Sequence, residues 1–142
     1  ESLLDRLAKN YDGYCFDEFY KKKVFSTWSV NNFFQSVVTN KLVDFGEYWY
    51  NNGGLPSILV NYLKTHELNV FEYLNKEKPI TIPVNDFFNP TALTTINQNV
   101  LMCQTGYLTL RSALTSGDLT VDLGIPNGEI YKALNRLLAI NF

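Results

Sequence analysis

The sequence predicts an α+β protein that is mainly α-helical. Apolar residues recur at helical spacing in most segments, and segments with strand-like alternation are few and short. The last third carries a helix, two short alternating segments and a closing helix, an order compatible with a winged-helix-like module and its β-hairpin. We therefore expect a helical region with a short N-terminal hairpin at residues 1–78 and a winged-helix-like region at residues 79–142.

The first region opens with a helix in which three leucines share one face. Gly13 marks a turn because glycine accepts a positive φ at low cost, and residues 14–16 then predict a short strand that pairs with residues 24–26. Ser26 or Thr27 is expected to cap the following helix. The apolar face of that helix, predicted to be core, consists of Val30, Phe33, Phe34, Val37 and Val38.

Aromatic residues 45–50 are expected to pack beside the next helix, and the Asn-Asn-Gly-Gly string that follows breaks the chain before Pro56. Proline suits a first helical turn because its missing N–H removes no hydrogen bond there. A helix is predicted over residues 57–64 and a second, short one over residues 69–74. Two prolines make residues 79–84 an extended edge segment, or a linker between two lobes.

The second region is predicted to begin with a helix from residue 89 to about residue 104, which Gly106 stops. Residues 107–112 and 118–123 read as two strands of a hairpin, with the turn between them. The closing helix has an apolar face of Ile130, Leu134, Leu137 and Leu138.

Composition and charge limit the classes of function that this chain can have. With 142 residues, 46% of them hydrophobic, the chain can bury a core, and its net charge of −2 argues against strong general attraction to nucleic acid or anionic lipid. Cys15 and Cys103 form neither a metal-spaced pair nor a Cys-x-x-Cys motif. No apolar run approaches the roughly 18 residues of a membrane span. We expect a cytoplasmic protein, and a piece of a longer parent because the chain lacks an initial Met.

Five short motifs carry a resemblance. They are Tyr-Asp-Gly-Tyr at 11–14, Phe-Ser-Thr-Trp-Ser-Val at 25–30, Tyr-Trp at 48–49, Gly-Gly-Leu-Pro at 53–56 and Gln-Thr-Gly-Tyr-Leu-Thr at 104–109. In this order and spacing, over residues 4–138, the chain resembles the segment after the ATPase core in the AAA-ATPase-like family of predicted bacterial ATPases. Members of that family usually end in a PD-(D/E)XK nuclease-like domain. Residues 21–27 depart from the family, which more often has a Tyr-Asn-Pro-like string there.

The resemblance implies a parent protein that binds ATP with Mg²⁺, and it implies that this chain packs against the ATPase core and the nuclease-like domain of the same parent. It makes residues 1–78 lid-like, with Gly54 and Pro56 as contacts to the adenine of a nucleotide held by the core. The simpler interpretation of this turn needs no ligand, because Gly-Gly can end one helix and Pro can start the next.

Catalytic motifs are missing from the sequence. No Gly-x-x-x-x-Gly-Lys-Ser/Thr string can cradle phosphates, and no Asp or Glu has Lys two positions later, as the nuclease motif requires. His66 is the sole histidine, has no nucleophile elbow to serve, and is interpreted as an exposed helix-end residue. Without a His and Cys cluster no metal site is predicted, so we expect neither catalysis nor a cofactor in this chain itself.

Two other classes of function stay open. A DNA-binding module would use Arg111, Lys132 and Arg136, although nearby acidic residues leave little positive charge for it and favour a packing role. A protein-interaction scaffold is suggested by 10 Phe, 9 Tyr and 2 Trp, some of which could be exposed and support a homo-oligomer. Tyr48 and Trp49 are expected to be core.

Overall fold

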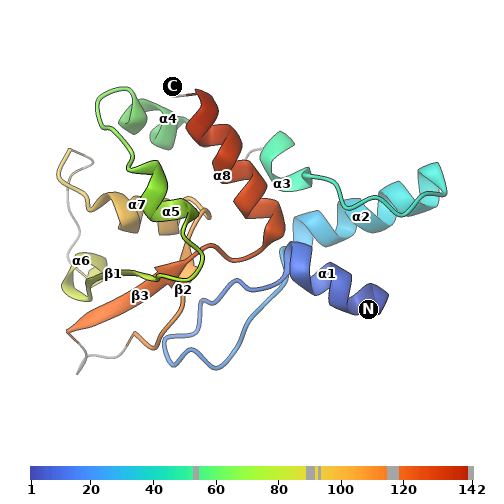
Figure 1. The fold of residues 1–142 in the computed structure, drawn as a ribbon, viewed down its shortest axis with the longest axis horizontal. Coiled ribbons are helices and arrows are strands. Elements are labelled where there is room, and N and C mark those ends of the chain that lie inside the picture. The colour runs from blue at the N-terminus through green and yellow to red at the C-terminus, as the bar shows by residue number, and fades with distance from the viewer. Residues whose placement is uncertain (53–54, 89–91, 93, 115–118, 141–142) are drawn as a thin grey trace.

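The computed structural model describes residues 1–52, 55–88, 92, 94–114 and 119–140 (Figure 1). Within these ranges the chain forms eight helices and one three-stranded antiparallel sheet, which confirms an α+β protein that is mainly helical. The helices are α1 Leu3–Tyr11, α2 Thr27–Asn40, α3 Tyr48–Asn51, α4 Ser57–Leu63, α5 Val70–Leu74, α6 Asn85–Phe88, α7 Gln98–Gln104 and α8 Gly128–Ile140. The strands are β1 Ile80–Pro83, β2 Thr109–Leu110 and β3 Thr120–Gly124.

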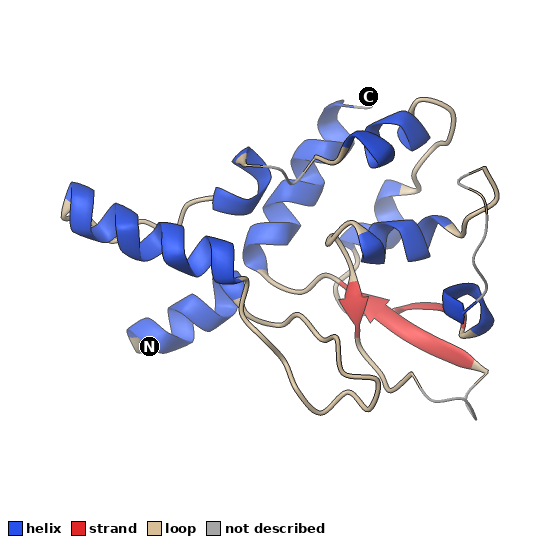
Figure 2. Cartoon of the chain, turned by 180° about the vertical axis from the view of Figure 1, so that it is seen from behind, coloured by secondary structure: helices blue, strands red, loops and turns tan. Residues whose placement is uncertain are grey.

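The sheet has the order β1-β3-β2, so β3 is central and β1 is an edge strand. Ile80 pairs with Leu123 on one side of β3, and Leu110 pairs with the same Leu123 on the other. The predicted edge segment at residues 79–84 is thus confirmed, and it is part of the core rather than a linker, because Ile80 and Ile82 are buried. Figure 2 shows helices stacked on one face of these strands.

The predicted hairpin of the last third is present as the β2–β3 pair, but β2 is shorter than the predicted strand. The backbone N–H groups of Tyr107 and Leu108 both donate to the carbonyl of Met102, at 3.0 and 3.1 Å. These two residues therefore complete the C-terminus of α7 and cannot join the sheet ladder. The positive φ of Gly106 turns the chain between the two elements, as its position predicted.

Helix α8 is the centre of the main core. The face predicted from its spacing is confirmed, since Ile130, Leu134 and Leu137 are almost completely buried and Leu138 nearly so. The same hydrophobic cluster takes side chains from the sheet, from α4 and α7, and from Tyr14 and Cys15 near the N-terminus. Residues on both sides of position 78 therefore pack on one core.

A second, small core holds together a helical arm, which we define as α1, α2 and residues 41–47. This core consists of Leu7, Tyr11 and Phe33, and Phe45 and Tyr48 pack against it. In Figure 1, α2 extends away from the body of the protein. The prediction that the whole apolar face of α2 is core is wrong: Phe33 is buried, but Phe34 is 47% exposed and Val38 is 78% exposed. In the far half of the helix, Val37 still packs against the small core, whereas Phe34 and Val38 stay exposed.

Two further predictions need correction. The strands expected at residues 14–16 and 24–26 reduce to a single antiparallel bridge between Tyr14 and Val24. The helix expected from residue 89 begins only at Gln98, where the Asn97 side chain accepts a hydrogen bond of 2.9 Å from the backbone of Asn99. Such a cap fixes the start of a helix, and residues 94–97 before it are not helical. Residues 89–91 and 93 lie outside the described ranges.

Other helix ends match the sequence. Ser26 caps α2, with its hydroxyl accepting from the backbone of Ser29. Pro56 stands directly before α4 with φ −63°, and Leu59 and Tyr62 form the buried face of that helix. The short helix expected at residues 69–74 is α5.

Candidate functional site

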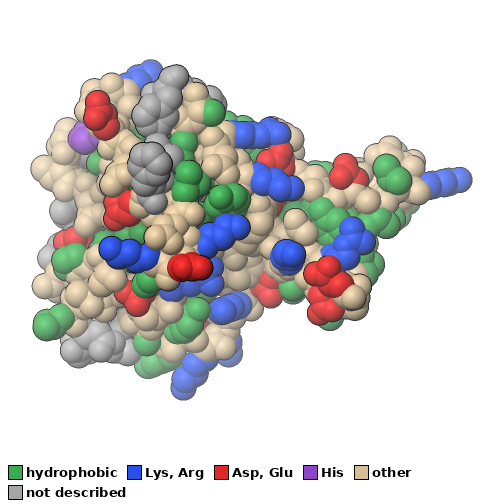
Figure 3. Space-filling model, in the orientation of Figure 1, with side chains coloured by type: hydrophobic (Ala, Val, Ile, Leu, Met, Phe, Trp, Pro, Cys, Tyr) green, Lys and Arg blue, Asp and Glu red, His purple; other side chains and the backbone are tan. Residues whose placement is uncertain are grey.

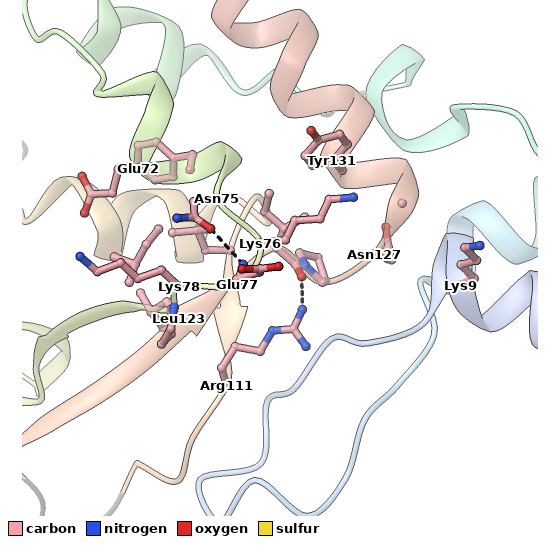
Figure 4. A pocket seen from close by; sticks show the side chains of 18 residues that line it. Lys9, Glu72, Asn75, Lys76, Glu77, Lys78, Arg111, Leu123, Asn127 and Tyr131 are labelled. Atoms are coloured by element: carbon pink, nitrogen blue, oxygen red, sulfur yellow. Dashed lines mark hydrogen bonds between the residues drawn. The ribbon is translucent and has the colours of Figure 1, made fainter.

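A hollow of about 510 Å³ lies among the described residues. It lies between the loop from α5 to β1, the ends of β2 and β3, and the start of α8, and α1 closes one side of it (Figure 4). Four basic side chains line it, from separate parts of the chain: Lys9, Lys76, Lys78 and Arg111. Two acidic residues, Glu72 and Glu77, share the lining.

One wall of the hollow is the connection from β3 to α8, and it is tightly packed against the turn after α1. Asn127 donates from its amide to the carbonyl of Asp12 at 2.8 Å, and its side-chain oxygen accepts from the N–H of Ile130 at 3.0 Å. Gly13 has φ +96°, and a Cβ there would lie 2.1 Å from the carbonyl oxygen of Pro126. Only glycine fits this contact. The side chain of Asn127 and the lack of one at Gly13 therefore both hold this wall against the turn after α1.

Arg111 is held across the end of the sheet. Its backbone N–H donates to the carbonyl of Asp122 at 2.7 Å, and its guanidinium donates to the carbonyl of Ile125. A Cβ on Gly124 would lie 2.9 Å from the Nε of Arg111. The Arg111 side chain can pass over Gly124 because that residue has no side chain. Within the described part of the chain the guanidinium of this exposed arginine has no other hydrogen-bond partner, so its remaining N–H groups can meet a ligand.

Two aromatic rings, Tyr131 in the lining of this hollow and Phe45 beside it, are each covered by a cation. The Nζ of Lys76 lies 3.8 Å from the centroid of the Tyr131 ring, and the guanidinium carbon of Arg6 lies 4.6 Å from the Phe45 centroid. Tyr131 and Phe45 are only half-buried. Such cation–π contacts are weak at exposed sites, about 0.5–1 kcal/mol, so a stronger partner can displace the cation.

A second hollow of about 380 Å³ adjoins the first. The two share Lys9, Lys76, Gly128 and Tyr131, and the second adds Arg6 and Lys132 to the basic lining. Together the two hollows hold six of the 12 Lys and Arg residues of the chain. Figure 3 shows blue side chains gathered over the middle of this face. We call the joined hollows the basic groove.

The residues predicted for nucleic-acid contact separate into two places. Arg111 and Lys132 lie at the basic groove, whereas Arg136 forms an ion pair with Glu47 and lies 5.5 Å from the Tyr50 ring centroid. Lys9, Arg6, Lys76 and Lys78 were not singled out from the sequence. Their only signal there was the Lys-Glu-Lys string in the break after α5, since folding alone brings the four together.

For the predicted nucleotide contacts, Gly54 lies outside the described residues, and Pro56 is half-buried at the start of α4. His66 is half-buried at the end of α4, where its ring stacks on Tyr62 at 4.0 Å and its Nδ1 lies 3.0 Å from the Tyr62 carbonyl oxygen. These contacts give the histidine a packing role at the end of the helix.

A buried carboxylate joins the arm to the body. Glu129, at the start of α8, is 2% exposed and accepts hydrogen bonds from the Ser29 hydroxyl at 2.7 Å and the Trp49 N–H at 2.8 Å. Burial raises the pKa of the Glu129 carboxyl above its ordinary 4.5, and these two hydrogen bonds partly oppose the rise. Because three helices meet at this carboxylate, it is a structural junction.

No group of three or more His, Cys, Asp and Glu residues in the described ranges could hold a metal ion. None of the described helices combines the length and apolar character needed to cross a bilayer.

Comparison with protein-family models, with curated proteins and with solved structures gave no match.

Proposed function

We propose that this chain is a non-catalytic part of an AAA-type ATPase, and that its helical arm docks on the ATPase core of the same parent protein. In that role it would contribute to nucleotide-dependent regulation or to domain packing. The observation that carries the proposal is the exposed apolar surface of the arm. Seven of the fifteen exposed large hydrophobic residues in the described ranges lie on it: Leu3, Leu4, Trp28, Phe34, Val38, Leu42 and Val43.

Exposed apolar residues scattered singly need no explanation, but a gathering on one element marks a contact surface. Here the surface belongs to an arm whose helix α2 extends from the body, and Glu129 of the body fixes that helix by its hydrogen bond to Ser29. Glu129 also binds the N–H of Trp49 in α3, the helix directly after the arm. An arm that is anchored at its base and apolar along its length suits docking onto a neighbouring domain. A protein-interaction scaffold that forms homo-oligomers through the same arm is the alternative.

The finer parts of the proposal follow from the family resemblance. In the parent, residues 1–78 would act as a lid, with Gly54 and Pro56 near the adenine of a bound ATP–Mg²⁺, and residues 79–142 would form the winged-helix-like part that packs beside the nuclease-like domain. The order α7, β2, β3, α8 supports the second assignment. We place the parent in the cytoplasm. A winged-helix mode of DNA binding is less supported, because Arg136, one of its three predicted contacts, is paired with Glu47.

The test is binding of this protein to the separately expressed ATPase core of its parent, measured by calorimetry. Val38→Asp places a charge on the arm, and Leu119→Asp, at a residue that is 89% exposed near β3, is the matched control. Burial of a valine side chain is worth about 1.5 kcal/mol or more, so Val38→Asp should weaken binding at least about tenfold while Leu119→Asp leaves it unchanged.

Absence of binding to the core, or equal weakening by both variants, would contradict docking through the arm. Concentration-dependent dimerisation that Val38→Asp abolishes, without core binding, would favour the homo-oligomeric scaffold. The role of the turn at Pro56 is tested separately: the parent protein should bind ATP more weakly after Pro56→Ala if the turn contacts nucleotide, and equally well if the turn is structural.

A further inference from the structure

We infer that the basic groove binds a single strand of nucleic acid, with its phosphates on the lysine and arginine side chains and its bases on Tyr131 and Phe45. The groove includes Arg6, Lys9 and Phe45 of the arm, but none of the seven exposed apolar residues on which the docking proposal rests. The inference therefore does not depend on that proposal. It also differs from the winged-helix mode considered above, in which a helix would enter the major groove of a duplex.

Local charge is the first argument. Six basic residues and three acidic ones, Glu1, Glu72 and Glu77, line the groove, for a net charge of +3 in a chain whose total is −2. The rest of the chain is therefore clearly acidic, and Figure 3 shows Lys and Arg side chains gathered over the middle of the face that it draws. A polyanion is the ligand that gains most from such a face, because every paired phosphate releases a condensed counterion.

The shape of the groove favours a strand over a compact anion. A small phosphate site gathers several donors around one point, often backbone N–H groups at a tight loop. Here the cations come from α1, the α5–β1 loop, the residue after β2, and α8. They are spread over two hollows of about 510 and 380 Å³ that share four lining residues. Figure 4 shows the labelled side chains spread across the first hollow, with Lys78 and Lys9 on opposite sides of it, and Lys9 also lines the second hollow. Successive phosphates of one strand match this distribution.

The aromatic rings supply the second element of strand recognition. Proteins that bind single strands combine a basic groove with aromatic side chains on which bases stack. Tyr131 and Phe45 line the groove, and each ring has a cation over its face in the free protein, Lys76 and Arg6 respectively. A strand offers both groups a better partner at once: the cations can move to phosphates, and the uncovered rings can accept bases.

The experiment is fluorescence anisotropy with a short labelled oligothymidylate, at a series of salt concentrations. The variant Lys78→Glu/Lys132→Glu changes two exposed lysines at separate places in the groove, and Lys21→Glu/Lys22→Glu makes the same change of charge on an exposed loop. If each groove lysine contacts one phosphate, the slope of log affinity against log salt should fall by about 1.4 in the groove variant. The loop variant should retain the slope of the unchanged protein.

Stacking is tested by Tyr131→Ala against Tyr131→Phe. Because stacking is worth about 1–3 kcal/mol per base, the alanine variant should bind the strand at least about fivefold more weakly, while phenylalanine preserves binding. No binding of the oligonucleotide at low salt would overturn the inference, as would equal losses in the groove and loop variants. Equal affinity for a duplex, or full competition by inorganic phosphate, would overturn the assignment to a strand. Val38→Asp should leave strand binding unchanged, so failure of one proposal can be told from failure of the other.

Discussion

Removal of the buried carboxylate of Glu129 should loosen the arm from the body. In Glu129→Ala, the Ser29 hydroxyl and the Trp49 N–H both lose the acceptor that they contact at 2.7 and 2.8 Å. A buried donor left without a partner costs about 1–3 kcal/mol, so for two donors we expect a loss of about 2–6 kcal/mol in the free energy of unfolding. Glu129→Gln keeps one of the two acceptor oxygens, and its loss should be about half as large.

The same carboxyl should give the stability an unusual dependence on pH. Burial makes the pKa of Glu129 higher in the folded protein than in the unfolded chain, where it is near 4.5. The contribution of this group to stability is therefore fully present below the unfolded pKa and is lost as the pH rises through the folded pKa. Glutamine does not titrate, so the stability of the unchanged protein relative to Glu129→Gln should decrease from about pH 4.5 towards neutral pH.

Urea unfolding followed by tryptophan fluorescence, repeated over this pH range, measures both effects. Glu67→Gln is the control, because Glu67 is exposed and its substitution should change stability by less than about 0.5 kcal/mol. The junction assigned to Glu129 would be refuted if Glu129→Ala were as stable as this control. A stability difference between the unchanged protein and Glu129→Gln that grows with rising pH would refute the direction of the pKa shift.

Two further substitutions test the packing. Gly13→Ala should destabilise the protein by more than about 1 kcal/mol, since φ is +96° and the new Cβ would meet the Pro126 carbonyl at 2.1 Å, whereas Gly128→Ala, with its nearest contact at 3.4 Å, should have little effect in the same urea titration. Phe33→Ala should cost about 3–5 kcal/mol because its ring is completely buried, while Phe34→Ala should cost much less. Equal costs within either pair, in thermal or chemical unfolding, would contradict the packing described for that site.

Local signals predicted six of the eight helices in the described ranges, because caps and apolar spacing act within a few residues. The four-residue helices α3 and α6 were not predicted, and α7 begins later than expected. Ser26 fixed the start of α2, and the spacing of apolar residues in α8 identified a face that is in fact buried. Where prediction failed, contacts outside the segment decided the outcome. The apolar spacing of α2 gives no information on whether a partner covers Phe34 and Val38, and β2 is short because Met102 takes the N–H groups of the residues before it.

The basic groove was predicted only in part, for the same reason. Arg111 and Lys132 could be selected as basic residues on a hairpin and a helix, but Lys9 and Lys76 reach them only through the packing of α1 and of the α5–β1 loop. The net charge of −2 also gave no indication of the groove, because the total charge of a chain does not show where its basic residues lie in the fold. Which lysines converge is a property of the tertiary fold.

The contacts of the turn after α1 bear on how the protein is made. Asp12, Tyr14 and Cys15 find their hydrogen-bond partners at Asn127, Gly106 and Thr109, between 92 and 115 residues later in the chain. During synthesis these early residues leave the ribosome long before their partners exist, and contacts so distant in sequence form slowly. The main core can therefore close only when nearly the whole chain has been translated, and a nascent chain stalled before residue 106 should remain open to proteases.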